Sequence, residues 1–283
     1  MLRESELQPA VTFAAASHFT LGELVPLWNR AYEAYFVPLS FDIAQLAWHL
    51  TRSDIEPSKS VVGFVDGEPF GLSLAGIRGE RAWIGGFGIA LEQRRKGLAT
   101  LLMREHLLRL RAAGLTEVWL EVIDTNPARE VYRRCGFAET RELLAFGGHV
   151  APAEAELEEI DADELVRTHA RLHTAPPSWR RQAETLVHDV EAGADPLALR
   201  RGGAIAAFAV AEPRGDRLAL HDAAAADADA GAVLLAALAA RWPGLRLRLI
   251  DEPEGTAFAE AAQAAGLVTD LKQWEMVARS PHP

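Results

Sequence analysis

Apolar and polar positions follow two periodicities in the first half of the chain, one typical of strands and one typical of helices. Short apolar runs predict strands at residues 11–16, 60–66, 70–77, 81–89, 117–123 and 139–146. Longer runs with helical spacing predict helices at residues 24–36, 41–50, 98–113 and 126–137. Thr20 and Glu23 have the spacing of a capping box at the start of the first helix.

The second half repeats much of this order. Strands are expected at residues 155–160, 197–201, 204–212, 217–223, 245–251 and 273–279, and helices at 178–190, 230–242 and 256–267. Asp161 and Glu164 form a second capping-box pattern. The pattern predicts an α+β protein (α/β with mixed sheets) made of two copies of one unit, each a twisted, mostly antiparallel sheet flanked by helices. We expect domains at residues 1–148 and 161–283, joined by a linker at 149–160.

Charge and composition narrow the classes of partner. The net charge of −11 over 283 residues argues against nucleic acid or an anionic membrane and favours a neutral or cationic small substrate. Cys135 is the single cysteine, so no disulfide can form within the chain, as expected in a reducing compartment. The first ten residues lack the apolar core of a signal peptide, and the alanine-rich run 223–240 is too polar to span a bilayer. We therefore expect a cytoplasmic protein.

Positive charge is concentrated in the segment QRRKGLATLL, at the start of the helix expected at 98–113. The first N–H groups of a helix have no partner within the helix, and together with the helix dipole they attract anions. Gly97 would allow a phosphate to approach the backbone, and Arg94, Arg95 and Lys96 add positive charge. The segment has neither the Walker nor the Rossmann pattern. On these grounds alone it is either an anion site or a solvated basic helix start.

The neighbouring motifs favour the anion site. Residues 94–99, RRKGLA, match the Q/R-x-x-G-x-G/A signature of the GNAT superfamily of N-acetyltransferases. The preceding FGIAL lies where that family has a strand with a bulge, and NPAREVYRRCGF resembles its later N-x-x-A…Y-x-x-x-G-F element. The resemblance covers residues 11–148 and implies that the anion is the pyrophosphate of acetyl-CoA, with no metal.

The resemblance also implies which residues contact the cofactor. The backbone of Phe87, Gly88 and Ile89 would pair with the pantetheine arm. The full set of cofactor-binding residues is then Phe87, Gly88, Ile89, Arg94, Arg95, Lys96, Gly97, Leu98, Ala99, Thr100 and Asn126. The glycines at 85, 86 and 88 would either let the strand depart from its neighbour or only ease tight packing.

Direct attack of an amine on a thioester needs an acid for the departing thiolate and a base for the ammonium. By resemblance Tyr132 is the acid, and the alternative is an aromatic side chain on a packed face. Glu121 is either the base or a strand-edge glutamate paired with an arginine. Tyr35 and Phe36 are our candidates for walls of the acceptor pocket.

Other reactive side chains fit structural roles better. His169 and His173 have a spacing that suits a metal, but the sequence offers no third ligand nearby, so we expect two surface histidines. Cys135 is expected to fill a small apolar space. The second half has Ala262 at the position of Tyr132, and Asp227 and Asp229 where the first half has its cationic loop. We expect this half to be a degenerate copy without a cofactor site.

These observations predict an acetyl-CoA-dependent N-acetyltransferase that acts on a primary amine of a small molecule, with one active site in the N-terminal half. Two alternatives remain. The first is a non-catalytic CoA-binding sensor or interaction module. The second is an acyltransferase that uses a longer acyl donor or acts on a protein N-terminus. The acceptor and the oligomeric state are not defined by the sequence, because acceptor pockets are built from variable helices and loops.

Overall fold

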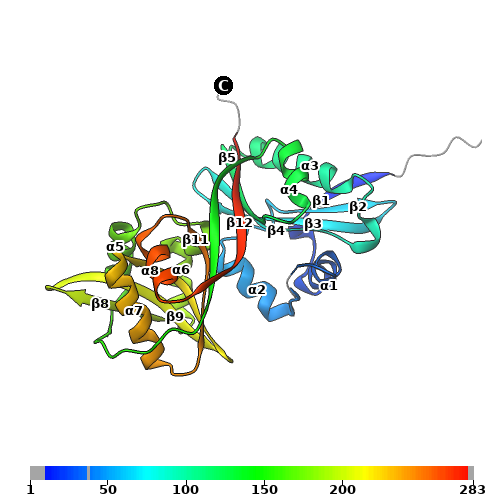
Figure 1. The fold of residues 1–283 in the computed structure, drawn as a ribbon. Coiled ribbons are helices and arrows are strands. Elements are labelled where there is room, and N and C mark those ends of the chain that lie inside the picture. Colours follow the sequence, from blue (N-terminus) through cyan, green and yellow to red (C-terminus); the bar gives the residue numbers. More distant parts are fainter. Residues whose placement is uncertain (1–9, 37–38, 280–283) are drawn as a thin grey trace, which may run out of the picture. The chain divides into compact units, whose positions relative to one another are not determined.

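The computed structural model describes residues 10–36 and 39–279, and the first nine residues, on which the expectation of no signal peptide rests, lie outside them. The chain divides into two compact units. Unit 1 holds residues up to Leu120 together with Pro127–Ala138 and the chain from Met276. Unit 2 holds Glu121–Asn126 and Glu139–Glu275. Both units combine an open, mostly antiparallel sheet with helices, so the predicted fold class is confirmed (Figure 1).

The sheet of unit 1 follows the order of the chain. Its strands are β1 (Val11–Ala15), β2 (Val61–Val65), β3 (Glu68–Arg78), β4 (Arg81–Ile89) and β5 (Glu117–Ile123). Neighbouring strands are antiparallel from β1 to β4, whereas β4 and β5 are parallel. A parallel pair needs a crossover connection, and the long helix between these two strands supplies it.

Four helices complete unit 1: α1 (Leu21–Ala31), α2 (Ile43–Arg52), α3 (Leu98–Ala112) and α4 (Ala128–Arg134). Successive strand residues point to opposite faces of a sheet. Val62 accordingly joins the core cluster of α1, and its neighbour Val61 joins that of α3. Helices therefore cover both faces of this sheet.

The first helix is shorter than the sequence predicted. The capping box of Thr20 and Glu23 is present, but α1 ends at Ala31 and not at residue 36. Ala34 has a φ of +55°, a left-handed conformation that no α-helix contains. The segment after the helix instead turns Tyr35 edge-on to Tyr32, with ring centroids 5.2 Å apart.

In unit 2 the strands are β12 (Val268–Arg279, to Glu275 in this unit), β6 (Ala138–Gly148), β11 (Arg246–Pro253), β10 (Arg217–Ala225), β9 (Ala204–Arg214), β8 (Asp195–Arg201) and β7 (Glu158–Glu159), in sheet order. The pair β10–β11 is parallel, and β9–β10, β8–β9, β7–β8 and β6–β11 are antiparallel. The expected strand at 155–160 is reduced to the two residues of β7.

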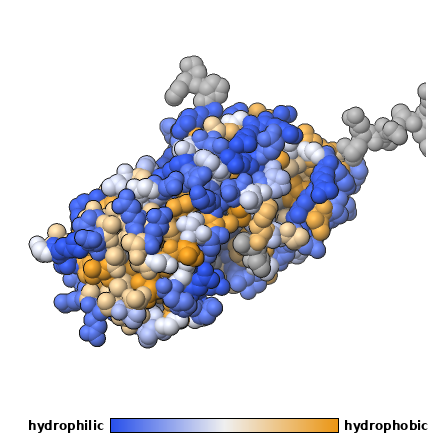
Figure 2. All heavy atoms as spheres, in the orientation of Figure 1, coloured by the Kyte–Doolittle hydropathy of each residue, from blue (hydrophilic) through white to orange (hydrophobic). Residues whose placement is uncertain are grey.

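The helices of unit 2 are α5 (Ala162–Leu172), α6 (Ala183–Glu191), α7 (Ala228–Arg241) and α8 (Ala257–Ala264). The helix expected at 178–190 is split into the 3-10 turn η3 (Trp179–Arg181) and α6, because Gln182 between them is extended. Alanine lets α7 pack closely on α8 in the core, and Figure 2 shows hydrophobic residues gathered over α7 on an otherwise mostly hydrophilic face.

The boundaries of the compact units differ from the predicted domain limits at a few segments. Glu121–Asn126 and the strand β6, which runs through Gly148, belong mainly to unit 2. As a division into domains that fold and act separately, the limits at 148 and 161 remain a prediction. Within the described ranges, no helix combines the length and apolar character needed to cross a membrane.

Candidate functional site

The strand β4 separates from β5 after a short parallel ladder. In the described structure that ladder consists of three pairs, which join Arg81–Trp83 to Glu117–Trp119. On its other side β4 carries a bulge, because Gly86 pairs with Leu74 whereas Ile84 pairs with the next residue, Ala75. Gly85 is the extra residue. A bulge changes the direction of a strand, so the second half of β4 offers a backbone edge beyond the ladder.

The two glycines after the bulge allow α1 to approach β4. A Cβ at Gly86 would lie 2.3 Å from the ring of Trp28, and one at Gly88 would lie 2.8 Å from Cβ of Ala31. Both distances are shorter than any real contact. Tight packing therefore applies to Gly86 and Gly88. It applies equally to Gly85, where a Cβ would lie 2.3 Å from the ring of Trp83, and Gly85 is in addition the residue at which the strand bulges.

Phe87 lies between these glycines and contacts two tyrosines. Its N–H donates a hydrogen bond to the hydroxyl of Tyr32 at 3.0 Å. Its ring is edge-on to the ring of Tyr132, with centroids 5.6 Å apart. The structure thus brings a predicted cofactor-binding residue next to the predicted acid. Tyr32 was not singled out from the sequence, because nothing in its spacing distinguishes it from a core aromatic.

The loop of residues 90–97, which the sequence predicts to bind an anion, leads from β4 into α3 through the turn η2 (Leu91–Gln93). Gly97 is the N-cap of α3 with a φ of +80°, and the space around a Cβ at this position is open to 4 Å. Since glycine has no side chain, it cannot cap the helix as serine or aspartate does. The first N–H groups of α3, from Leu98 and Ala99 onward, are therefore left to an external acceptor. Leu98 itself is buried and anchors the helix start in the core.

The three cations of the loop have different roles. Arg94 donates to the carbonyl oxygens of Ile89, Ala31 and Glu33 at 2.8–3.0 Å, so its guanidinium ties the loop to the end of α1. Arg95 and Lys96 are exposed, and Lys96 Nζ donates to the side chain of Gln93. Positive charge at the helix start is therefore supplied by Arg95 and Lys96, while Arg94 shapes the loop.

Tyr132 is buried on α4, between the rings of Phe87 and Phe137. Burial raises its pKa well above the usual value, and the nearby Tyr32 and Tyr35 raise it further. Its hydroxyl therefore stays protonated at neutral pH. Cys135, at the end of the same helix, is half-buried, and burial raises the pKa of its thiol, which keeps it a neutral side chain.

The remaining predicted residues are only partly brought together. Tyr35 is half-buried beside Tyr32, and the ring of Phe36, which is 51% exposed, lies edge-on to Tyr35. Glu121 and Asn126 are half-buried and lie in the segment of β5 and its following turn that is counted with unit 2. Their participation in the site stays a prediction.

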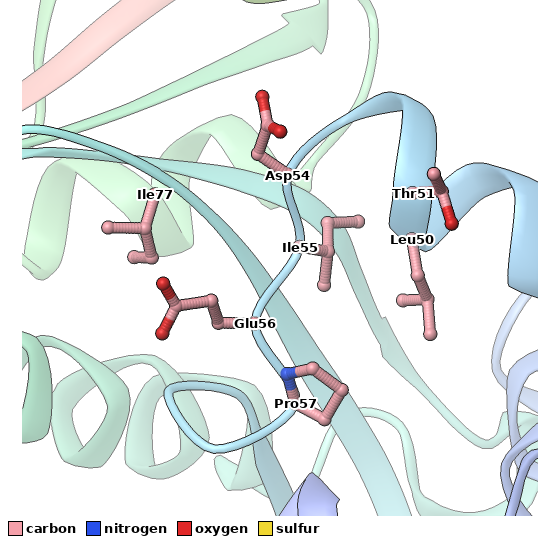
Figure 3. Close-up of a pocket in the computed structure, with 7 residues that line it drawn as sticks. All are labelled: Leu50, Thr51, Asp54, Ile55, Glu56, Pro57 and Ile77. Carbon is pink, nitrogen blue, oxygen red and sulfur yellow. The ribbon is translucent and has the colours of Figure 1, made fainter. Parts of the chain in front are cut away.

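A shallow pocket of about 370 Å³ lies elsewhere in unit 1, beside the end of α2 (Figure 3). Its acidic members are Asp54 and Glu56, and Leu50, Ile55 and Ile77 supply apolar walls. The carboxylate of Asp54 accepts from Arg78 at 2.7 Å. None of the residues predicted to bind cofactor or substrate lines this pocket.

Unit 2 repeats the geometry of the strands but not that of the helix start. Its parallel pair β10–β11 has four paired positions, after which β10 bulges at His221. The helix that follows, α7, begins at Asp227, whose carboxylate accepts from the N–H of Ala230 at 2.7 Å. The helix start that Gly97 leaves open in unit 1 is thus capped internally in unit 2.

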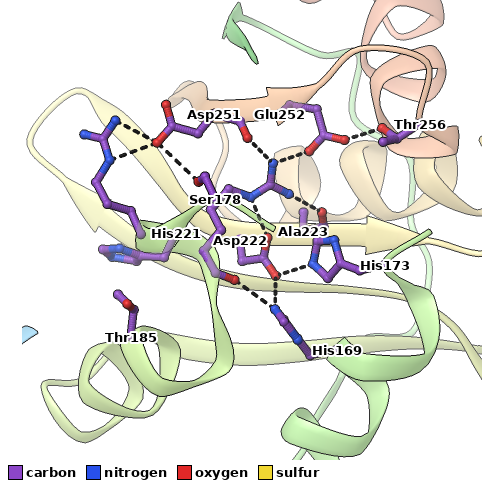
Figure 4. A network of polar contacts seen from close by, with 12 residues as sticks. His169, His173, Ser178, Thr185, His221, Asp222, Ala223, Asp251, Glu252 and Thr256 are labelled. Atoms are coloured by element: carbon purple, nitrogen blue, oxygen red, sulfur yellow. Dashed lines mark hydrogen bonds and ion pairs between the residues drawn. The ribbon is translucent and has the colours of Figure 1, made fainter. Parts of the chain in front are cut away.

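The side chain of Arg181, which is 1% exposed, bonds to both diverging strands of unit 2. Figure 4 shows its partners Asp222, Ala223, Asp251 and Glu252. The guanidinium donates to Asp222 Oδ1 at 2.7 Å and to the carbonyl oxygen of Ala223 at 2.9 Å, both on β10. It also donates to Glu252 and to the carbonyl oxygen of Asp251 at 3.0 Å, both on β11. One arginine therefore clamps the two strands together.

The prediction that His169 and His173 are surface histidines is wrong. The two side chains are 8% and 9% exposed, and both Nε2 atoms face the buried carboxylate of Asp222. The sequence could not supply this neighbour, because Asp222 lies 49 residues beyond His173. The sequence did contain one sign of these buried charged residues. Charged residues interrupt the apolar strands LALHDAAA and LRLIDEP.

Unit 1 thus has a bulged strand that diverges from its parallel neighbour and is followed by an open helix start. A family model described as the acetyltransferase (GNAT) family matches residues 22–137. The match lies within the N-terminal half, and it covers less than half of the 283 residues of the chain. Among curated proteins, none matches the sequence.

Solved structures resemble the chain over its whole length. A putative acetyltransferase from Pyrococcus horikoshii has a TM-score of 0.68 at 16% identity, covering 99% of this chain and 93% of that one. A GCN5-related N-acetyltransferase from Sphaerobacter thermophilus has a TM-score of 0.69 at 10% identity, with 96% and 97% covered. A tandem GNAT protein from the clavulanic acid biosynthesis pathway has a TM-score of 0.67 at 14% identity, with 97% and 100% covered. At these identities the likeness shows the fold alone.

Proposed function

We propose that the protein is an acetyl-CoA-dependent N-acetyltransferase that acts on a primary amine of a small molecule, with its one active site in the N-terminal half of the chain. The observation that carries this proposal is the set of groups gathered there: an uncapped helix start at Gly97, the edge of β4 beyond its bulge, and Tyr132 against Phe87. Each group would serve a separate step of the reaction, and the match of this half to the acetyltransferase (GNAT) family model supports the reaction class.

The residues of unit 1 fit the chemistry of the co-substrate. The N–H groups that follow Gly97 offer donors to a pyrophosphate, and exposed Arg95 and Lys96 add positive charge. The open space at Gly97 permits close backbone approach. The main chain of Phe87, Gly88 and Ile89 offers donors and acceptors to an extended amide-containing arm. When bound, acetyl-CoA supplies the activated thioester.

The chain's own residues then handle protons and polarise bonds. Tyr132, kept neutral by burial, holds a proton on its hydroxyl for the departing thiolate. The N–H of Phe87, which donates to Tyr32 in this structure, can donate to a carbonyl oxygen if that hydroxyl moves aside. Glu121 is proposed as the base that receives the proton of the ammonium group. Tyr35 and the exposed Phe36 are proposed as walls for the acceptor.

Unit 2 is proposed to bind no CoA. Its helix start is capped by Asp227, and Arg181 clamps its diverging strands. Ala262, buried on α8, has no hydroxyl to donate a proton. We therefore expect one CoA per chain, and two equivalents measured by calorimetry would contradict this part of the proposal.

The proposal is tested by measuring thiol release from acetyl-CoA with a panel of small primary amines. Turnover in the wild type that falls sharply in Tyr132→Phe supports it. CoA binding without turnover on any amine would indicate the sensor function instead. Acetylation of peptides only, or faster transfer of longer acyl groups, would replace the proposed acceptor or donor and retain the reaction class.

A further inference from the structure

Two imidazoles and a carboxylate converge in unit 2, far along the chain from the residues proposed for catalysis (Figure 4). His169 lies in the last turn of α5 and His173 is the C-cap of that helix, with ring centroids separated by 4.5 Å. Asp222 Oδ2, on the bulged part of β10, lies 2.9 Å from His173 Nε2 and 3.7 Å from His169 Nε2. Three possible ligand atoms therefore lie within 4.8 Å of one another.

These separations lie close to the edge length of a metal coordination sphere, and the shorter one is a hydrogen bond from His173. A tetrahedral ion with bonds of about 2.0–2.2 Å to nitrogen and oxygen places neighbouring ligand atoms roughly 3.3–3.6 Å apart. The two distances from Asp222 Oδ2 bracket that value. Histidines four residues apart on a helix form a chelating pair, because their side chains lie above one another on the same face.

A hydrogen bond from Arg181, outside the group of His169, His173 and Asp222, holds the carboxylate of Asp222 in position. Arg181 Nε donates to Asp222 Oδ1 at 2.7 Å, which leaves Oδ2 directed at the imidazoles. The carbonyl oxygen of Arg181 lies 2.8 Å from His169 Nε2, so a fourth oxygen atom is also at hand. Ligands in metal sites are commonly oriented in this way by a second layer of hydrogen bonds.

The charges of the cluster leave room for a cation. The carboxylates joined to it are Asp222, Asp251 and Glu252, and the guanidinium groups are Arg180 and Arg181. With both imidazoles neutral, three negative charges face two positive ones. An unbalanced buried charge is costly. The remaining charge is −1, which a proton on one histidine would bring to zero and a divalent ion to +1, so charge alone does not choose between them. The geometry favours the ion, because a proton would use one imidazole whereas both Nε2 atoms face Asp222 Oδ2.

We infer that His169, His173 and Asp222 form a binding site for a divalent transition-metal ion, with zinc as the best match to two nitrogen ligands and one oxygen ligand. The ion would link α5 to β10, and the carbonyl of Arg181 or a water would complete its coordination. Binding uses the Nε2 lone pairs, so the proton that each Nε2 donates to the carbonyl of Arg181 or to Asp222 would move to Nδ1, and a doubly protonated imidazole would release one proton. The site would stabilise unit 2 and does not depend on the proposed activity.

The test uses the full-length, untagged chain after removal of metals with a chelator. Calorimetry with Zn²⁺ and visible absorption with Co²⁺ are measured for the wild type, His173→Gln and His169→Gln. His188→Gln on α6, which contacts Glu191 and lies outside the trio, is the matched control. We expect one Zn²⁺ per chain in the wild type and in the control, and at least about 100-fold weaker binding in the other two variants.

Thermal unfolding with and without Zn²⁺ provides a second measurement that does not depend on a variant. A bound ion should raise the melting temperature of the wild type and of His188→Gln, but not that of His173→Gln. If the wild type takes up no stoichiometric Zn²⁺, the cluster is balanced by a proton and the inference is wrong. Equal Zn²⁺ binding by all four proteins would likewise overturn it, because the ion would then sit elsewhere.

Discussion

Replacing Arg181 with methionine should destabilise unit 2 more than any exposed arginine substitution. The wild-type guanidinium makes four hydrogen bonds, two to carboxylates and two to carbonyl oxygens of β10 and β11. Asp222 and Glu252 are 0% and 2% exposed. Methionine keeps most of the apolar stem of the side chain, so the change removes the charge and its hydrogen bonds with little loss of packing.

The size of the expected loss in the free energy of unfolding follows from the two carboxylates that stay buried. Breaking a buried ion pair by removing one partner costs about 3–5 kcal/mol, because the other charge stays buried without compensation. Here two carboxylates lose their partner. Both carboxylates keep other hydrogen bonds, from His173 to Asp222 and from Thr256 to Glu252. We therefore expect a loss of about 3–5 kcal/mol in the free energy of unfolding of unit 2.

Urea unfolding of the full chain, followed by circular dichroism, measures this loss. Because two compact units can unfold separately, the transition that shifts is assigned to unit 2 by its tryptophan fluorescence in a Trp179-only background. Arg200→Met is the matched control, since Arg200 pairs with Glu158 and Glu164 at the surface and should change stability by less than about 1 kcal/mol.

A loss below about 1 kcal/mol in Arg181→Met would refute the reasoning, because it would mean that the buried carboxylates are satisfied without the arginine. A double variant provides a further check. Asp222→Asn alone should be destabilising, yet combined with Arg181→Met it should cost less than the sum of the two single changes. Strict additivity would show that the two side chains do not interact as the structure describes.

Three further changes test unit 1. Gly97→Val should weaken CoA binding at least about 10-fold by blocking backbone approach, whereas Gly114→Val, at a position with a similar φ of +86° and equally open space, should leave calorimetric affinity unchanged. Tyr132→Phe should lower kcat about 10²–10⁴-fold with CoA affinity preserved, since its ring still packs on Phe87; a wild-type rate would eliminate it as the acid. Burial lowers the pKa of His106 to about 4, below the unfolded value near 6.5. The unfolded chain therefore binds a proton at this histidine before the folded chain does as the pH falls. The free energy of unfolding should accordingly drop by roughly 2–4 kcal/mol between pH 6.5 and 4. His106→Gln should lose most of this slope in urea titrations, and an unchanged slope would contradict the assignment.

The sequence predicted most of the elements because their boundaries are marked locally. Capping residues, turn glycines and changes of hydrophobic period all act within a few residues of the boundary they set. The predicted α1 was too long because only such local signals were available. Tyr32 and Tyr35 continue an apolar helical period past Ala31, and the left-handed conformation of Ala34 is decided by packing that the period does not contain.

The buried cluster of unit 2 could not be predicted, because its members come from segments that only the folded chain brings together. Arg181 reaches residues 41 to 71 positions further along the chain. Each of its partners, taken alone, has the appearance of an acid at the end of an apolar strand. Such an acid predicts that a partner exists, but it does not identify the partner. In unit 1 the match to a known family motif allowed separate segments to be assigned to one site, which the spacing of the residues alone did not allow.

The two units differ in whether the start of the helix after the bulged strand is capped within the chain. In unit 1, Gly97 leaves the first N–H groups of α3 without a side-chain cap, an arrangement that gives up only a few tenths of a kcal/mol relative to a good N-cap. In unit 2, Asp227 supplies that cap, and Arg181 bonds to both diverging strands. Backbone and charged groups that an external anion or an extended ligand would need are thus satisfied within the chain. Internal satisfaction favours stability, and open groups favour binding, so the same fold can serve either purpose at the cost of the other.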